Sequence, residues 1–328
     1  MKSVRYVVTG GAGFIGSHIA EALVARGETV RVFDNLSTGN EANLAHLVER
    51  VELVRGDLRD YDAVSAAVRG AEVVFHEGAL PSVPRSIADP KASLEINING
   101  TQNVLLAARE GGVRRVVYAS SSSVYGNSPA LPKHEAMPTA PLSPYAVHKL
   151  AGEQLCAVFS HIYGLETVSL RYFNVFGPRQ DPKSEYAAVI PRFITALLTG
   201  VRPTVFGDGE QTRDFTYVAN VVRANLLAAN APAAVGRAMN IGCGERISLN
   251  DVLHVLGELL GVDPSAEHQS PRLGDVRDSL ADISRGGELL GYVPAVHLRE
   301  GLQETINALR SALPAAAPAQ PAALHPNP

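Results

Sequence analysis

The chain has 328 residues, 46% of them hydrophobic, which is enough for a large core in one domain or two closely joined ones. Its formal net charge is −4, and no basic tract with interleaved aromatic residues is present, which disfavours a nucleic-acid partner. Two cysteines, Cys156 and Cys243, supply neither a disulfide framework nor a zinc cluster. No apolar stretch is long enough to span a membrane, and the N-terminal MKSVRYVVTGG is too short for a signal peptide. We therefore expect a soluble cytoplasmic protein without a metal site.

Short apolar runs alternate with helical patterns along the first half of the chain. The run RYVVTG indicates a strand, and FIGSHIAEALVARG indicates a helix that ends near Gly27. The later valine runs are typical of strands buried on both faces, so the pattern predicts βαβ units and a doubly wound parallel sheet, an α/β fold. The predicted strands are 5–10, 29–34, 51–57, 71–76, 114–120 and 165–172, and the predicted helices are 14–27, 61–70, 89–110 and 145–163.

The texture of the sequence changes after residue 172, where glycine and proline become more frequent and the alternation less regular. We expect a first domain at 1–172 and a smaller α/β region at 173–310. Within the latter, RDFTYVANVVRANLLAA is regular enough to return to the first domain, so 214–236 is assigned there. Residues 311–328 are rich in alanine and proline without a periodic apolar face, which predicts a flexible tail.

A glycine-rich turn follows the first predicted strand. In TGGAGFIGSH, Gly10, Gly13 and Gly16 form G-x-x-G-x-x-G at a strand-to-helix junction, and Phe14 and Ile15 open the helix. Such glycines permit a tight turn and close approach of a pyrophosphate, whose charge the helix N-terminus would attract. This context predicts a Rossmann-like dinucleotide-binding domain.

The end of the second predicted strand distinguishes between two nicotinamide cofactors. Asp34 can accept hydrogen bonds from the hydroxyls of the adenosine ribose and would repel a 2′-phosphate, and Asn35 stands where an arginine would favour that phosphate. The sequence therefore predicts NAD rather than NADP. Asp57 and Leu58, in GDLRD at the end of the third strand, are expected to contact the adenine.

The stretch LSPYAVHKL places Tyr145 four residues before Lys149, a spacing that puts both on one face of a helix. Ser143 is suited to the N-cap and Pro144 to the first helical position. Taken alone, this spacing also describes a surface tyrosine beside a solvated lysine.

The motifs together resemble those of the extended short-chain dehydrogenases/reductases that act on nucleotide sugars, particularly 4-epimerases of UDP-N-acetylglucosamine and UDP-glucose. The resemblance extends to about Leu309 and rests on TGGAGFIG, DNLSTG, GDLRD, ASSSSVYG, SPYAVHK, LRYFNVFGP and GDGEQTRDFTYV. It implies that Tyr145, Lys149 and Ser121 are catalytic. Free tyrosine has a pKa of about 10. A nearby ammonium group, the nicotinamide charge and the helix N-terminus would each favour the phenolate, so we expect a lowered pKa for Tyr145.

The same resemblance implies the remaining contacts to NAD. Asn97 matches a residue beside the catalytic tyrosine, and Phe173 matches one that lines the nicotinamide. The family usually has His-x-Ala-Ala after the fourth strand, whereas this chain has HEGA with Glu77 and Gly78, a departure that can displace backbone contacts. The expected cofactor-binding residues are Gly10, Gly13, Phe14, Ile15, Gly16, Asp34, Asn35, Ser37, Thr38, Gly39, Asp57, Leu58, Asn97, Tyr145, Lys149 and Phe173.

The residues after Ser121 bear on the reaction. The related dehydratases have Asp and Glu at the positions of Ser122 and Ser123, and related decarboxylases have Glu at the second of them. A serine hydroxyl is no general acid at neutral pH, so dehydration and decarboxylation are disfavoured. We expect an NAD-dependent enzyme that inverts C4 of a UDP-hexose through a 4-keto intermediate. A UDP-glucuronate or other nucleotide-sugar epimerase remains the alternative, and a catalytically silent NAD-binding regulator is the non-enzymatic one.

The resemblance also implies the substrate contacts. Ser279 stands where glucose-restricted epimerases have a bulky tyrosine, which leaves room for a 2-acetamido group, whereas Thr204 and Phe206 depart from the polar residues expected beside the uridine. The family's homodimer would pair helices 89–110 and 145–163. Apolar residues such as Leu105 and Leu155 permit this pairing but also suit the intramolecular core. The expected substrate-binding residues are Ser82, Ser122, Ser123, Asn174, Gln180, Ala188, Val189, Arg213, Arg272, Asp275 and Ser279.

Overall fold

The structure is a computed structural model that describes residues 4–181, 188–270 and 277–312. Within these ranges, seven parallel strands form one central sheet in the order β11-β6-β5-β4-β1-β2-β3. Because all strands are parallel, their carboxyl ends lie at one edge of the sheet, where ligands of open α/β sheets bind. The strands are β1 (Tyr6–Thr9), β2 (Val30–Asp34), β3 (Val51–Arg55), β4 (Val73–His76), β5 (Arg115–Ser121), β6 (Glu166–Tyr172) and β11 (Arg237–Ile241).

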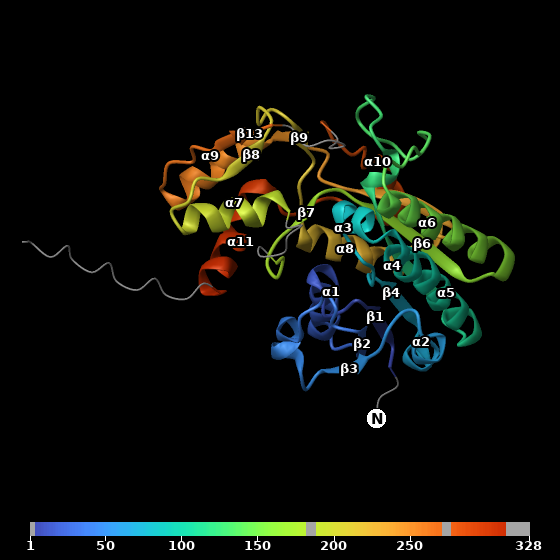
Figure 1. Cartoon of the computed structure of the whole chain (residues 1–328). Coiled ribbons are helices and arrows are strands. Elements are labelled where there is room, and N and C mark those ends of the chain that lie inside the picture. The colour runs from blue at the N-terminus through green and yellow to red at the C-terminus, as the bar shows by residue number, and fades with distance from the viewer. Residues whose placement is uncertain (1–3, 182–187, 271–276, 313–328) are drawn as a thin grey trace, which may run out of the picture.

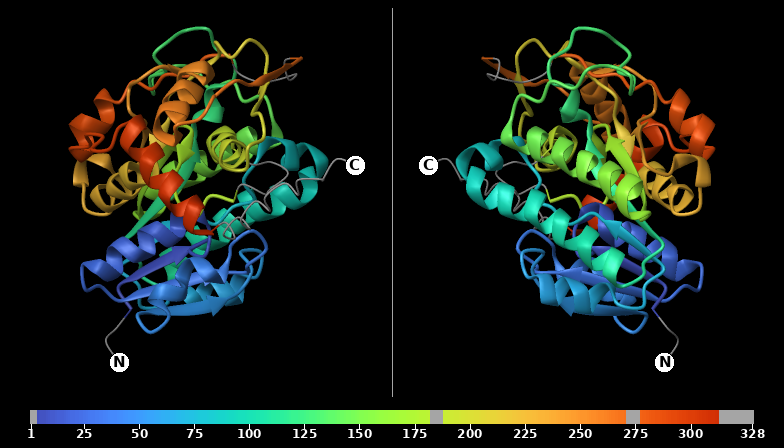
Figure 2. Two further views of the ribbon diagram at one scale, coloured as in Figure 1. Left: turned by 90° about the vertical axis from the view of Figure 1, so that its left-hand side faces the viewer. Right: turned by 90° about the vertical axis from the view of Figure 1, so that its right-hand side faces the viewer.

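Helices cover both faces of this sheet (Figures 1 and 2). Side chains of α1 and α8 pack on one face around Val8, Phe75 and Leu170, and those of α2, α5 and α6 pack on the other. The domain is therefore doubly wound and Rossmann-like, as the sequence predicts. The helices are α1 (Phe14–Ala25), α2 (Tyr61–Val68), α5 (Gly100–Glu110), α6 (Pro144–Tyr163) and α8 (Val218–Ala228), with short α3 (Val83–Ala88), α4 (Pro90–Leu94) and α10 (Ser284–Leu290) and the 3-10 turns η1 (Glu41–Leu47), η3 (Ser122–Tyr125) and η4 (Pro232–Ala234).

Two elements differ from the predictions. The sheet gains β11 beside β6, so the part of the chain that joins the first domain extends beyond the predicted 214–236. The long helix predicted at 89–110 is divided into α4, a π-helical turn η2 (Glu95–Asn99) and α5. The six strands predicted from apolar runs are all present, with ends that shift by a few residues.

The smaller second region has its own core, made by Ile190, Phe193, Val252 and Leu256 among others. It lies at the upper left of Figure 1, away from α2 and β3. Its elements are α7 (Val189–Leu198), α9 (Leu249–Leu260) and α11 (Leu298–Ala312), the parallel pair β8 (Thr204–Phe206) and β13 (Glu267–Gln269), and the short strands β7 (Val175–Phe176), β9 (Thr212–Arg213), β10 (Thr216–Tyr217) and β12 (Ile247–Ser248).

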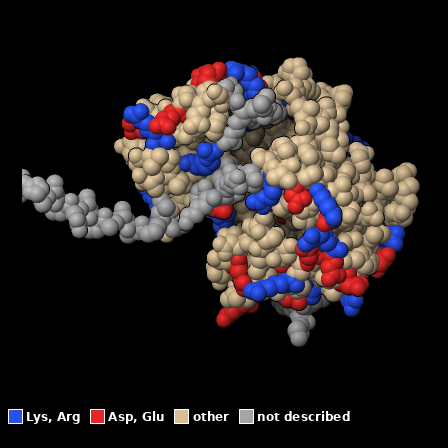
Figure 3. All heavy atoms as spheres, viewed as in Figure 1, with Lys and Arg blue, Asp and Glu red and all other residues tan. Residues whose placement is uncertain are grey.

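The described helices and the face drawn in Figure 3 bear on membrane and nucleic-acid partners. In the part of the chain that the structure describes, no helix has the length and apolar character needed to cross a bilayer. On the face drawn in Figure 3, basic and acidic side chains are interspersed rather than gathered by sign. This face therefore offers no extended basic footprint for nucleic acid.

Candidate active site

The turn between β1 and α1 forms a cradle that only glycine can line. Gly10 has a φ of +65°, and a Cβ there would lie 2.6 Å from the Cα of Gly78. A Cβ on Gly16 would lie 2.3 Å from the carbonyl oxygen of Gly10. Gly13 is the N-cap of α1 and no side chain caps this end, so the first-turn N–H groups and the positive end of the dipole face the turn. The cradle fits the pyrophosphate of a dinucleotide.

Asp34 and Asp57 close the adenosine side of this cradle. The buried Asp34 carboxylate accepts hydrogen bonds from the N–H of Ala12 at 3.0 Å and of Leu36 at 2.8 Å, so it stabilises the glycine turn. Asp57 accepts from Asn35 at 2.9 Å and forms an ion pair with Arg59 at 2.8 Å. The Arg59 hydrogen bond holds the pKa of Asp57 well below its usual range. Asp57 therefore remains charged at neutral pH beside a site for ribose and adenine.

The other residues predicted around the adenosine are arranged as follows. Leu58 is buried and lies against Gly78 and Gly100. Ser37 and Thr38 are exposed. Gly39 lies close to Asp34, because a Cβ placed on Gly39 would be 3.0 Å from Oδ2 of Asp34. Their contacts with the cofactor stay predictions.

The catalytic pair lies at the start of α6, against the end of β5. Ser143 caps α6 by accepting from the N–H of Ala146 at 3.2 Å, and Pro144 is the first helical residue, which confirms the predicted start. The Tyr145 phenol lies close enough to Ser121 for the serine to lower its pKa, and the Lys149 ammonium lies 5.9 Å from the Tyr145 ring centroid. The interpretation of a surface tyrosine beside a solvated lysine does not hold, because Lys149 is buried and Tyr145 is only partly exposed.

The predicted lowering of the Tyr145 pKa is wrong for the protein residues alone. Burial raises the pKa of Tyr145 to about 12, and the hydrogen bond with Ser121 lowers it only in part. Lys149 donates to the carbonyl oxygen of Ala119 at 2.7 Å instead of to the phenol, and burial lowers its own pKa. A low dielectric disfavours both charged forms, and the positive nicotinamide of a bound NAD would act in the opposite direction on the phenol.

Two residues predicted to contact the cofactor have other partners. Phe173 is fully buried and packs beside Tyr125, with ring centroids 6.3 Å apart, and its contact with the nicotinamide stays a prediction. Asn97 lies in the π-helical turn η2 and accepts from the N–H of Leu80 at 2.7 Å while donating to Ser93 at 3.3 Å. It therefore anchors the loop after β4, and its contact with NAD stays a prediction.

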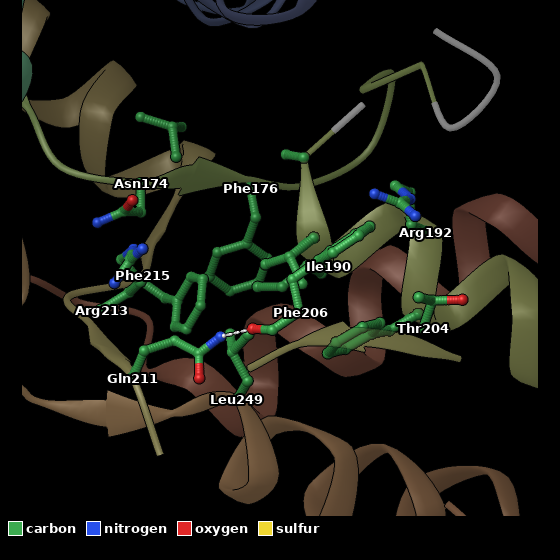
Figure 4. Close-up of a pocket in the computed structure, with 14 residues that line it drawn as sticks. Asn174, Phe176, Ile190, Arg192, Thr204, Phe206, Gln211, Arg213, Phe215 and Leu249 are labelled. Atoms are coloured by element: carbon green, nitrogen blue, oxygen red, sulfur yellow. Dashed lines mark hydrogen bonds between the residues drawn. The ribbon is translucent and has the colours of Figure 1, made fainter. Parts of the chain in front are cut away.

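A cavity of about 280 Å³ opens in the second region (Figure 4). It brings together four residues predicted to bind substrate, namely Asn174, Ala188, Val189 and Arg213. Arg213 donates to the carbonyl oxygens of Thr212 at 2.9 Å and Arg277 at 2.8 Å. Apolar walls with a few polar groups are typical of a small-molecule site. Further lining residues are Val175, Phe176, Ile190, Arg192, Phe193, Thr204, Phe206, Gln211, Phe215 and Leu249.

Gln211 is a lining residue that the sequence reasoning missed. Its Nε2 donates to the carbonyl oxygen of Phe206 at 2.6 Å, a bond drawn in Figure 4. Its Oε1 is buried and has no hydrogen-bond partner among the described residues. A buried acceptor without a partner costs free energy unless a ligand supplies a donor. Its place two residues before Arg213 in EQTRDF is the signal that could have found it.

The remaining predicted substrate residues are less directly placed. Ser82 caps α3, since its hydroxyl accepts from the N–H of Arg85 at 3.3 Å. Gln180 donates to Val175 at 3.2 Å, and its Oε1 is buried without a partner in the described chain. Ser279 is buried, and its N–H donates to Thr212 at 3.1 Å. Ser122 and Ser123 begin η3, and Ser123 donates to the Ser121 hydroxyl at 2.9 Å. Arg272 and Asp275 lie outside the described residues.

Comparison with known proteins defines the class. The model of the NAD dependent epimerase/dehydratase family matches residues 6–242, and the chain belongs to this family. It is therefore an NAD-dependent enzyme, and its relatives include UDP-sugar 4-epimerases.

Three relatives cover nearly the whole chain. The UDP-glucose 4-epimerase of Mycolicibacterium smegmatis is 41% identical over 312 residues, 94% of this chain and 99% of that protein. The solved UDP-N-acetylglucosamine 4-epimerase from Methanobrevibacter ruminantium, in complex with UDP-N-acetylmuramic acid, is 39% identical with a TM-score of 0.91 and covers 95% of this chain and 100% of that chain. The UDP-glucuronic acid 4-epimerase from Bacillus cereus, solved with UDP-glucuronic acid and NAD, is 33% identical with a TM-score of 0.88 and covers 94% of this chain and 100% of that chain.

Proposed function

We propose that the enzyme inverts C4 of a UDP-hexose, with UDP-N-acetylglucosamine and UDP-N-acetylgalactosamine as its main substrates and UDP-glucose and UDP-galactose as further ones. The observation that carries this proposal is that Ser121 lies close enough to Tyr145 to affect its pKa, with only hydroxyl side chains at the two positions that follow Ser121. The absence of carboxylic acids from the two positions after Ser121 suits a 4-keto sugar that keeps its substituents. The cavity with Arg213 and the unpaired Gln211 oxygen supports a nucleotide at the other end.

Tyr145, Ser121 and Lys149 each have a distinct task in this mechanism. Bound NAD supplies the hydride acceptor and donor. Tyr145, as phenolate, takes the proton of the C4 hydroxyl while Ser121 holds that hydroxyl in place. Ser121 is the last residue of β5, and Tyr145 lies near it at the start of α6. Lys149, fixed on the carbonyl of Ala119, keeps a positive charge beside the phenol. The same tyrosine returns the proton after the 4-keto sugar has turned its other face.

The preference for an acetamido sugar rests on Ser279. The three relatives described above are named for glucose, N-acetylglucosamine and glucuronic acid, so the family admits all three sugars. A serine at this place is small, and its neighbour Thr212 precedes the phosphate-binding Arg213. Space next to C2 of the sugar therefore favours the larger substituent. A UDP-glucuronate 4-epimerase is the alternative.

Turnover of UDP-N-acetylglucosamine, UDP-glucose and UDP-glucuronate by the purified protein tests the proposal. We expect the acetamido sugar to have the highest kcat/KM. In Ser279→Tyr the phenol ring should lower epimerisation of UDP-N-acetylglucosamine at least tenfold, while UDP-glucose turnover changes little. The shared uridine diphosphate makes UDP-glucose the internal control for folding, since a general defect lowers both rates. Equal losses on both sugars would place the acetamido pocket elsewhere, and no turnover on any sugar would favour the silent regulator.

We also infer a homodimer through α6. Val147, Val158 and Ile162 recur at helical spacing along α6 and are exposed, with the exposed Leu94 of α4 close in the fold. Leu105, in contrast, is fully buried in the intramolecular core, which is one of the two places expected for it, and Leu155 is partly buried against the same core.

Charge placed on this α6 stripe should separate the subunits. We expect Ile162→Asp to shift the sedimentation coefficient from that of a dimer to that of a monomer. Val201, which follows α7, is 60% exposed, close to the 62% of Ile162. Val201→Asp is therefore a matched control that should leave the dimer intact. A wild-type monomer, or equal effects of both variants, would contradict the inferred interface.

The two cysteines support a cytoplasmic location for this enzyme. Cys156 and Cys243 are both buried as free thiols, which suits a reducing compartment.

A further inference from the structure

Glu77 lies at the carboxyl end of β4, where the HEGA sequence departs from the family pattern. The β4–β5 register pairs His76 with Tyr118, so the next step along both strands sets Glu77 beside Ala119. The carbonyl oxygen of Ala119 is the acceptor of the Lys149 ammonium, at 2.7 Å. On its other side, the backbone of Glu77 and Gly78 lies against Gly10 of the cofactor cradle. The backbone of Glu77 thus lies between the cofactor turn and the end of β5, which holds Lys149.

Two neighbours fix the Glu77 carboxyl as a hydrogen-bond acceptor. The Tyr172 hydroxyl lies 2.7 Å from Oε1 of Glu77, and Nδ2 of Asn225 lies 2.8 Å from the same hydroxyl. Since the Asn225 amide donates to the phenol oxygen, the single Tyr172 proton must point to Glu77. A carboxyl that only accepts is stabilised in its charged form.

The groups that face Glu77 come from several elements. Burial lowers the pKa of Lys149, and the charge of Glu77 opposes this lowering. Burial raises the pKa of Tyr145, and the charge of Glu77 adds to this rise. Tyr172 of β6 stays neutral because burial raises its pKa well above the usual value. His76, on the same strand, bonds to Thr9 at 2.7 Å and Thr101 at 3.0 Å, and burial lowers its pKa to about 3, so it carries no charge at neutral pH. Among these neighbours, the Lys149 ammonium is therefore the positive charge that interacts with the Glu77 carboxylate.

The ionisation of Glu77 is itself balanced near neutrality. Burial raises the pKa of its carboxyl far above that of a free glutamate, while the Tyr172 hydrogen bond and the Lys149 charge oppose this rise. The negative charge is therefore gained as the pH rises into the neutral range, and it then makes Tyr145 and Lys149 each hold a proton to higher pH.

We propose that Glu77 is a positioning residue for the catalytic pair: its carboxylate, fixed by Tyr172, sets the protonation equilibria of Tyr145 and Lys149 and thereby the pH range of activity. The inference rests on the proposed roles of these two residues. Without the carboxylate both residues lose their protons at lower pH. Loss from Tyr145 creates the base and loss from Lys149 removes the supporting charge, so both limbs of the pH profile should move to lower pH together.

The test is Glu77→Gln, which keeps the shape and removes the charge. We expect both limbs of the kcat profile to move down by at least about half a pH unit. Independently of turnover, tyrosinate difference spectra of the NAD-loaded protein against its Tyr145→Phe counterpart report the titration of Tyr145. That midpoint should fall by a similar amount in Glu77→Gln.

Two further variants separate this role from a structural one. Glu77→Asp keeps the charge and should retain a midpoint close to the wild type, whereas a merely structural role would make it as defective as Glu77→Gln. Glu72→Gln, just before the same strand but in a surface ion pair with Arg5, is the matched control and should shift neither measurement. A folded Glu77→Gln protein with an unshifted tyrosinate midpoint overturns the proposal. A shifted midpoint without turnover on any UDP-sugar supports the inference on the pair and overturns the proposed reaction instead.

Discussion

Tyr145→Phe is expected to lower kcat by a hundredfold or more, the range for loss of a general base. The variant keeps the partly buried ring at the start of α6 and removes only the hydroxyl near Ser121. Because the glycine cradle and Asp34 lie on other elements, the protein should still purify with NAD. Steady-state epimerisation, together with extraction of the bound nucleotide, measures both effects.

Tyr163→Phe is the control for this substitution. Tyr163 is the last residue of the same helix and is half exposed, so removal of its hydroxyl should leave kcat unchanged. If Tyr145→Phe turned over at nearly the wild-type rate with NAD bound, another group would have to be the base. If it lost NAD as well, its effect on kcat would have to be measured with saturating cofactor.

Arg171→Met should destabilise the fold by about 3–5 kcal/mol, the range for removing one partner of a buried ion pair. The Arg171 guanidinium contacts Glu153 through Nε at 2.9 Å and Nη2 at 2.7 Å, and its Nη1 donates to the Tyr125 hydroxyl at 2.9 Å. Both charged side chains are buried, and Glu153 also accepts from Ser120 on the catalytic strand. Methionine would leave the Glu153 carboxylate without its counter-charge, and urea unfolding measures the resulting loss.

Two comparisons test whether the buried charge is the cause. The double variant with Glu153→Leu removes both charges and should recover much of the stability, because hydrophobic replacement of a whole buried pair is often neutral. Arg299→Met breaks the exposed pair with Glu258, at 2.6 Å, and should cost no more than about 1 kcal/mol. Equal losses for Arg171→Met and Arg299→Met would contradict the argument.

Features that depend on a few neighbouring residues could be predicted from the sequence. The strands follow from apolar runs, and the start of α6 follows from Ser143 and Pro144, since a cap is a contact between residues three apart. The glycine turn follows in the same way, because the positive φ of Gly10 and the close approach of Gly16 to Gly10 both lie within the turn. Local backbone chemistry determined these elements before any long-range packing.

Features that depend on distant segments were decided only by the tertiary structure. β11 joins the sheet because β6 offers it an open edge, and its own sequence, RAMNI, has no distinctive apolar run. Phe173 belongs to the core because Tyr125 and Ala281 enclose it. Gln211 becomes a site residue because Phe206 engages its amide and leaves the oxygen unpaired.

The ionisation of the catalytic pair shows the same division most clearly. The sequence by itself determined that Tyr145 and Lys149 share one face of a helix, because the α-helical repeat requires it. It could not determine that the Lys149 ammonium bonds to Ala119, or that Glu77 faces the pair from another strand. A pKa depends on burial and on charges within several ångströms, and those neighbours come from segments far apart in the chain. Only the packed sheet brings β4, β5 and α6 together, and it therefore decides which proton the enzyme can move.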